Sequence, residues 1–231
     1  GTRTQDESNA RGMLVNFFSE YEIFIVIVIV MIAGTIVSEE FNKGTVKLLL
    51  IRPYKRTTIL TSKFITCLIM LAIIIISIML MQFVVGGVVF GFDSLQTPAI
   101  EYDFNAHSIQ EMSIASYMLI QTIGKLPIYV LLMTLAFALS TLFNNSAVAI
   151  TLALLGYMGS SMINMIGIQL DLDWVKYFVT PNWDLTQHFF GAIPMYEGTS
   201  LEFAMVINAI YFIIMLIPTY IVFKKRNIKN I

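Results

Sequence analysis

The residues of this chain whose types and spacing suit specific chemistry lie in one segment, residues 39–56. It reads Glu-Glu-Phe-Asn-Lys-Gly-Thr-Val-Lys-Leu-Leu-Leu-Ile-Arg-Pro-Tyr-Lys-Arg, so that an apolar run is enclosed by lysine and arginine. Such a segment either sinks into lipid headgroups or fills a groove on another protein. The chemistry we expect here is recognition of a surface, not the making or breaking of bonds.

Residue types that serve catalysis or metal binding are few and scattered. His107 and His188 are the two histidines, and they fall in different predicted loops with no cysteine beside them. A zinc site or a hydrolytic centre requires a closer cluster. Cys67, the single cysteine, lies inside an apolar run. We therefore expect no enzyme activity, no metal and no cofactor on this chain.

Composition places these residues in a membrane protein. Of 231 residues, 57% are hydrophobic and 13% are charged, and the mean hydropathy is +0.78. An ordinary soluble domain carries about 25% charged residues. The net charge of −1 gives no broad basic surface for nucleic acid. The expected fold class is all-α, a polytopic helical protein whose solvent is the lipid bilayer.

Five apolar runs are candidates for crossing a bilayer, whose hydrocarbon core of ~30 Å needs ~20 helical residues. A lead-in, three connecting segments and a tail separate and flank them. In chain order we expect a lead-in at 1–22, a span at 23–38, a cytoplasmic coupling segment at 39–58, a span at 59–91, an outer loop at 92–113, spans at 114–143 and 147–167, an outer loop at 168–202, a span at 203–223 and a tail at 224–231.

Local signals refine these boundaries. The polar run Asn144-Asn145-Ser146 predicts a tight turn between two spans, and Gly86, Gly87 and Gly91 predict a loosened helix near one membrane face. The first span is short, so it must extend beyond its uncharged run. Leu14, Phe17, Phe18 and Tyr21 have helical spacing, which favours an interfacial lead-in helix continuous with that span.

The distribution of basic residues predicts the orientation. Ten of the fourteen lysines and arginines fall in residues 43–63 or in the tail, together with only Glu39 and Glu40 as acids. The positive-inside rule makes that side cytoplasmic. If the C-terminal tail is cytoplasmic and five spans precede it, residues 1–20 must lie on the outer side of the membrane. The chain nevertheless opens Gly-Thr-Arg-Thr, with no signal peptide to carry this segment across. We therefore expect an earlier sixth span before Gly1 and both termini in the cytoplasm.

The coupling segment has its own start and stop signals. Ser38 is a candidate helix cap, Glu39 and Glu40 suit a helix start, and Arg52-Pro53 stops a short helix over 45–51. Its order of Glu, Gly-Thr, Leu-Leu, Arg-Pro and Lys-Arg, followed by a Lys-Phe, resembles the first cytoplasmic loop of ABC-2-type transporter permeases. The resemblance extends to Leu126-Pro127, the Phe-Asn-Asn-Ser turn, the loop Pro181-Asn182-Trp183-Asp184 and the basic tail, and so covers nearly the whole chain.

This resemblance implies a type V exporter-like architecture. Six-span permeases of that family pair as homo- or heterodimers, and their coupling helix docks on a separate nucleotide-binding subunit that holds ATP and magnesium. No Gly-x-x-x-x-Gly-Lys-Ser/Thr loop occurs here, so the ATPase would lie outside this chain. The setting implied is a bacterial plasma membrane. The residues implied in coupling are Glu39, Glu40, Phe41, Gly44, Thr45, Leu48, Leu49, Arg52, Pro53 and Arg56.

The substrate is less constrained by the sequence. Gln82, Asn164 and Trp183 are candidates for a substrate path, and fourteen methionines favour an adaptable apolar cavity. Hydrophobic or amphipathic cargo such as an antimicrobial peptide, a toxin or a drug fits this composition. The alternative is a non-transporting membrane sensor or scaffold that uses the same segment to anchor a cytoplasmic ATPase.

Two further interpretations concern the outer side. Lys125 precedes the uncharged run 126–170, so it could snorkel outward, pair with an outer acid or serve in a relay. Because no Asp or Glu falls inside the expected spans, a proton- or sodium-driven transporter is not expected. The aromatic-rich residues 171–200 form either a gate or an aromatic belt at the headgroup level.

Overall fold

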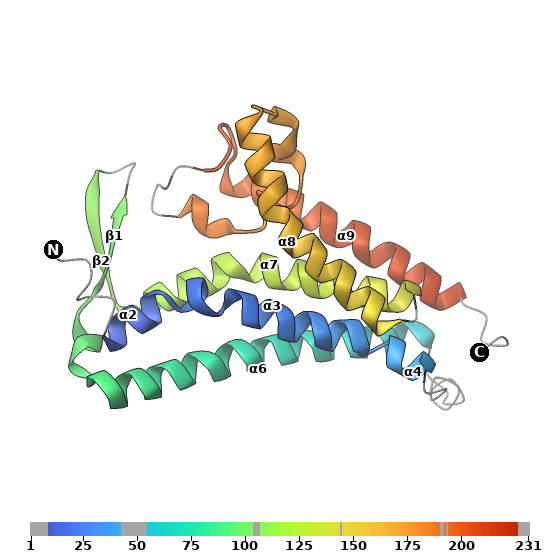
Figure 1. The fold of residues 1–231 in the computed structure, drawn as a ribbon, viewed down its shortest axis with the longest axis horizontal. Helices are drawn as coiled ribbons and strands as arrows, with labels where there is room; N and C mark the ends of the chain where they lie inside the picture. Colours follow the sequence, from blue (N-terminus) through green and yellow to red (C-terminus); the bar gives the residue numbers. More distant parts are fainter. Residues whose placement is uncertain are drawn as a thin grey trace.

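The computed structural model describes residues 9–42, 55–103, 107–143, 145–189, 192 and 194–225. Five long helices dominate the described chain. They are α3 (Phe17–Thr35), α6 (Arg56–Phe90), α7 (Ile114–Phe143), α8 (Ser146–Gln169) and α9 (Leu201–Lys225). Figure 1 shows α3, α6 and α7 side by side along the long axis, with α8 and α9 inclined to them.

The shorter elements gather at the two ends of this bundle. We call one end the basic end; there α4 (Ser38–Asn42) follows α3, and α6 begins. The opposite end, the hairpin end, carries α2 (Ala10–Val15) and an antiparallel hairpin of β1 (Ala99–Asp103) and β2 (Ser108–Met112). Three 3₁₀ helices complete the described fold: η1 (Asp93–Gln96), η2 (Asp173–Tyr177) and η3 (Leu185–His188).

The five long helices are each long and apolar enough to cross a membrane, which confirms the polytopic helical fold. The hairpin is an addition that the expected all-α class did not include. Its register pairs Ala99 with Met112 and Asp103 with Ser108. It lies in the expected outer loop 92–113, where the sequence was interpreted only as a connection.

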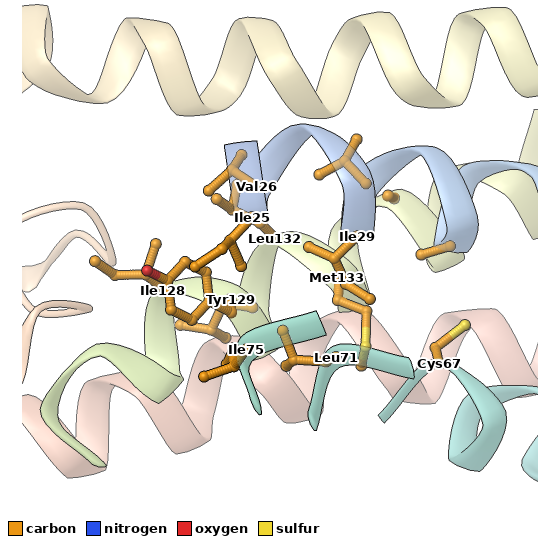
Figure 2. Packing of buried hydrophobic residues seen from close by; sticks show 14 of the residues in the cluster. Ile25, Val26, Ile29, Cys67, Leu71, Ile75, Ile128, Tyr129, Leu132 and Met133 are labelled. Carbon is orange, nitrogen blue, oxygen red and sulfur yellow. The ribbon is translucent and has the colours of Figure 1, made fainter. Parts of the chain in front are cut away.

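Helix α7 is the centre of the packing. It contacts α3, α8 and α9, and 61% of its most apolar window is buried, the largest share of the five helices. In Figure 2, Ile25 and Ile29 of α3 and Leu71 of α6 meet Leu132 and Met133 of α7. The α3 residues recur at the helical period, so one face of that helix is buried between its neighbours.

The turn between α7 and α8 forms where its sequence predicted. Helix α7 ends at Phe143, and the Asn145 side chain accepts hydrogen bonds from the backbone N–H groups of Ala147 and Val148. Asn145 is thus the N-cap of α8. The glycine prediction was wrong for Gly86 and Gly87, through which α6 continues, and right for Gly91, where α6 ends. Gly86 instead lets α2 approach, since an added Cβ would lie 3.3 Å from Ala10.

The described part of the N-terminal lead-in, residues 9–22, buries one face in the protein. Asn9 caps α2 by accepting from the N–H of Gly12, and α3 begins directly after Asn16. Leu14, Phe17 and Phe18 are all buried, so their shared face packs against the bundle and not against a membrane interface. The expected boundary at residue 23 therefore falls inside a helix that starts at Phe17.

Candidate functional site

A polar cavity of ≈ 250 Å³ lies toward the hairpin end, between α3, α7, α8 and the loop that joins α8 to α9. Hydroxyl, amide and carboxylate side chains share its wall with aromatic rings and thioethers. The described residues that line it are Glu22, Ile128, Tyr157, Met158, Ser160, Ser161, Asn164, Thr180, Pro181, Trp183, Asp184, Gln187 and Met195.

The loop wall of the cavity is held by side-chain amides. The Nδ2 atom of Asn182 donates to the backbone carbonyls of Lys176 and Phe178, both at 2.7 Å. Asn208 of α9 donates to the carbonyl of Asn182 at 2.8 Å. These bonds give side-chain partners to backbone carbonyls of η2 and of the loop that follows it. They fix the segment that presents Trp183 to the cavity.

Two glycines let this loop approach the helices closely. A Cβ on Gly124 of α7 would lie 2.6 Å from the Cγ2 of Thr186, and one on Gly167 of α8 would lie 2.2 Å from the hydroxyl of Tyr196. Neither contact is possible with a larger residue unless the loop moves. The position of the loop that forms this wall thus depends on two helix positions that have no side chain.

An ion-pair cluster borders the cavity. Lys125 Nζ of α7 lies 2.8 Å from Glu22 Oε2 of α3 and 2.7 Å from Asp184 Oδ2 of the loop. The three side chains are 16%, 20% and 31% exposed, respectively. This confirms the pairing interpretation of Lys125. With eighteen residues from Lys125 to Phe143, the cluster lies about 27 Å from the basic end of α7.

The carboxylates of the cluster have further partners. Tyr157 of α8 donates its hydroxyl to Glu22 Oε1 at 2.8 Å, and Asp184 Oδ1 accepts from the backbone N–H and hydroxyl of Thr186. The expectation that no acid lies within a spanning helix is corrected here. Glu22 belongs to α3, and the cluster joins α3, α7, α8 and the loop in one network.

His188 lies beside this cluster, at the end of η3. Burial lowers the pKa of its imidazole below the usual value of 6.5, and the nearby Asp184 carboxylate opposes that shift. Its Nε2 atom is buried, and within the described residues it has no hydrogen-bond partner. A neutral imidazole is therefore the favoured form at neutral pH.

The predicted path residues are only partly brought together. Asn164 and Trp183 both line the cavity, and Asn164 accepts a hydrogen bond from Thr180 at 2.9 Å. Gln82 lies elsewhere, in a small pocket between α2, α3 and α6 that Met13 and Tyr21 also line. Its amide is buried and has no hydrogen-bond partner in the described part of the chain. The expected path is therefore not one continuous set.

The predicted coupling residues are described in part. Glu39, Glu40 and Phe41 lie on α4, and Arg56 begins α6. Gly44, Thr45, Leu48, Leu49, Arg52 and Pro53 lie outside the described residues. Ser38, the expected cap, instead donates its hydroxyl back to the carbonyl of Gly34 at 2.8 Å.

Glu22, Tyr157 and Asp184 were missed as site residues. One signal was available for Glu22: it stands directly before the uncharged run that starts at residue 23, as Lys125 stands before the one that starts at 126. Two spans that start at the same membrane face place such residues at one depth. Opposite charges at equal depth are expected to pair.

Five apolar helices, with the mostly buried α7 packed among the other four, define a multi-pass α-helical membrane protein. The model of the family described as Protein of unknown function (DUF2705) matches residues 2–229, and the chain belongs to that family.

Two curated relatives come from Bacillus subtilis (strain 168). The chain is 32% identical over 201 residues to the uncharacterized protein YhcI, an alignment that covers 87% of this chain and 64% of YhcI. It is 28% identical over 188 residues to the uncharacterized membrane protein YdbK, covering 80% of this chain and 71% of YdbK. The chain thus spans slightly under two thirds of the length of YhcI. No solved structure matches it significantly.

Proposed function

We propose that this chain is the membrane-spanning permease subunit of an ATP-driven exporter of the ABC-2 type. Its task would be to couple ATP hydrolysis on a separate nucleotide-binding subunit to export of a hydrophobic or amphipathic substrate. The observation that carries the proposal is the charged segment 39–56 between two spanning helices, with both of its described ends tied to the bundle. In this proposal the basic end faces the cytoplasm.

The first tie joins α4 to α6. Lys63 Nζ of α6 pairs with Glu40 Oε1 at 2.5 Å and donates to the backbone carbonyl of Ile36 at 2.6 Å. The lysine thus links the end of α3, the start of the segment and the start of α6. A force applied to the segment would reach both spanning helices together.

The second tie joins the same region to α7 and α9. The backbone N–H of Ser38 donates to the hydroxyl of Ser140 at 3.0 Å, inside the protein. Arg56 donates to the backbone carbonyl of Lys224, and the hydroxyls of Thr61 and Tyr220 are 2.8 Å apart. Four of the five long helices therefore meet through polar contacts at the basic end, as a rigid coupling element requires.

The exposed faces of the bundle support a second permease copy or a related permease as partner. Only 22%, 17% and 22% of the apolar windows of α6, α8 and α9 are buried. These faces must be covered by lipid or by another chain, since they are apolar. An apolar groove of ≈ 710 Å³ between α6 and α7 adds a surface suited to hydrophobic cargo.

The test is ATPase coupling in a reconstituted pair. The chain would be co-purified with an ATP-hydrolysing subunit encoded beside it, and hydrolysis measured with and without candidate peptides or drugs. We expect Leu49→Asp to abolish stimulation and leave membrane insertion intact. Ile109→Asp, the same type of change on exposed β2 at the hairpin end, is the matched control.

Two results would contradict the proposal. The first is unchanged stimulation in Leu49→Asp, which would remove the segment from the coupling path. The second is an ATPase that binds the chain but whose hydrolysis never responds to substrate and moves none. That outcome is the one the sensor or scaffold alternative predicts.

A further inference from the structure

The polar cavity carries negative charge. Glu22 and Asp184 line it, and among its described lining residues there is no lysine, arginine or histidine. Lys125 reaches the same two carboxylates from α7 and is not part of the cavity wall. One ammonium shared by two carboxylates leaves a formal charge of −1 on the cluster, and this charge borders the cavity.

Aromatic rings form the rest of the wall beside these acids. The rings of Tyr157 and Trp183 have centroids 6.1 Å apart and planes inclined by 35°, and both residues line the cavity. Trp183 is only 8% exposed, so its position is set by the protein. The face of an indole or phenol ring attracts cations because of its quadrupole. Carboxylates and ring faces together favour a cationic guest.

The cluster also has hydrogen-bonding capacity that the protein does not use. The hydroxyl of Tyr129 is fully buried, and within the described residues it has no hydrogen-bond partner. It lies close enough to Glu22, Tyr157 and Asp184 to interact with them electrostatically. Buried polar groups in native structures almost always have a partner. Tyr129 is not among the described residues that line the cavity, so its hydroxyl lies behind the wall that Glu22, Tyr157 and Asp184 form.

We propose that this cavity binds the ammonium or guanidinium group of an organic cation. Glu22 and Asp184 would receive the charge, and Tyr157 and Trp183 would cover its apolar neighbours. The cavity of ≈ 250 Å³ is smaller than the ~300–1,000 Å³ of pockets that enclose drug-sized ligands, so it fits a charged head and a few carbons. The claim that the cavity binds a cation rests on the cavity itself. The further claim that this cation is the cargo of an exporter rests on the proposed function.

The first experiment compares three probes of one shape on the purified full chain. They are phenethylammonium, neutral phenethyl alcohol and anionic 3-phenylpropionate. The Trp174→Phe background leaves Trp183 as the only tryptophan, so its fluorescence reports the cavity. We expect saturable quenching by the cation with at least tenfold tighter binding than the alcohol, and no saturable response to the anion. Equal responses to all three, or preference for the anion, would overturn the proposal.

The second experiment neutralises one acid. Glu22→Gln keeps an acceptor for Tyr157 but removes the charge, and it should weaken binding of phenethylammonium at least tenfold, as loss of a charge-assisted hydrogen bond does. Asp171→Asn removes an exposed acid outside the cavity and should leave binding unchanged. Unaltered binding in Glu22→Gln would refute the assignment. If that variant does not fold, the probe comparison on the Trp174→Phe chain decides the question.

The two proposals fail separately. Probe binding needs no ATPase partner, so absence of cation preference overturns the cavity assignment and leaves the export proposal standing. Cation binding combined with ATP hydrolysis that no cation stimulates would support the cavity as a cation site and overturn its role in selecting cargo.

Discussion

Replacing Lys125 with methionine should destabilise the protein strongly, because it leaves two carboxylates in a mostly buried place without their cation. Lys125 makes ion pairs of 2.8 and 2.7 Å with Glu22 and Asp184. A hydrogen bond to a charged group contributes about 1.5–3 kcal/mol. The two together would give about 3–6 kcal/mol, and partial exposure of the carboxylates favours the lower end. We expect a loss of about 3 kcal/mol, near the range for a broken buried pair.

The reasoning makes a sharper prediction for the neutral triple variant Lys125→Met, Glu22→Gln and Asp184→Asn. The two amides keep the acceptors that Tyr157 and Thr186 use, and no charge is left uncompensated. Replacing a buried ion pair with neutral groups is often close to neutral in free energy. The triple variant should therefore recover to within about 1 kcal/mol of the starting chain.

The measurement is reversible unfolding in mixed micelles, followed by circular dichroism. Lys225→Met, an exposed lysine in the last turn of α9, is the control and should change the unfolding free energy by less than about 1 kcal/mol. A Lys125→Met effect no larger than this control would refute the reasoning. So would a triple variant as unstable as the single one, since the charges would then not be the cause.

Two further outcomes can be checked with the same unfolding measurement. Gly167→Val should destabilise the loop contact by about 1–3 kcal/mol, because its Cβ would lie 2.2 Å from the hydroxyl of Tyr196, whereas Gly159→Ala, with nothing within 4 Å of its Cβ, should not destabilise. Equal effects would contradict the steric argument. Burial lowers the pKa of His188, so the folded chain should lose stability as pH falls below about 6.5 through that lowered pKa, and His188→Gln should flatten this slope. An unchanged slope in His188→Gln would assign the pH dependence to other groups.

The parts of the fold that could be predicted from the sequence are those fixed by composition over many residues. Five apolar runs became five long helices, and the polar run at Asn145 became the turn that caps α8. The spanning helices follow from the need for uninterrupted apolar residues in the bilayer, and the turn follows from the need for a polar cap at a helix end. Both requirements are met by residues that are neighbours in the sequence. The pairing of Lys125 was also among the outcomes that the sequence predicted, because a lysine at the edge of an uncharged run must contact either water or an acidic side chain.

The site itself depends on contacts that no local pattern encodes. Counting uncharged residues placed the start of the first span at residue 23, and that rule removed Glu22 from the helix on which it lies. The loop wall depends on Asn208 meeting the carbonyl of Asn182, which is 26 residues earlier in the chain. Gly86 and Gly124 were equally ambiguous, since a glycine that breaks a helix and one that admits a neighbour have the same sequence signal.

The length of α6 relates this protein to the thickness of the membrane around it. Residues 64–90 of this helix contain no charged residue, and at 1.5 Å per residue they extend about 40 Å, against a hydrocarbon core of ~30 Å. Tilting alone would require about 40°, the upper limit of what spanning helices adopt. Ile65, Ile69, Ile73, Ile76 and Leu80 keep one side of α6 exposed and apolar along most of this stretch, so that side remains favourable in lipid over its whole length. In a thinner membrane this helix, and with it the hairpin beyond its far end, would therefore tilt further from the membrane normal than in a thicker one.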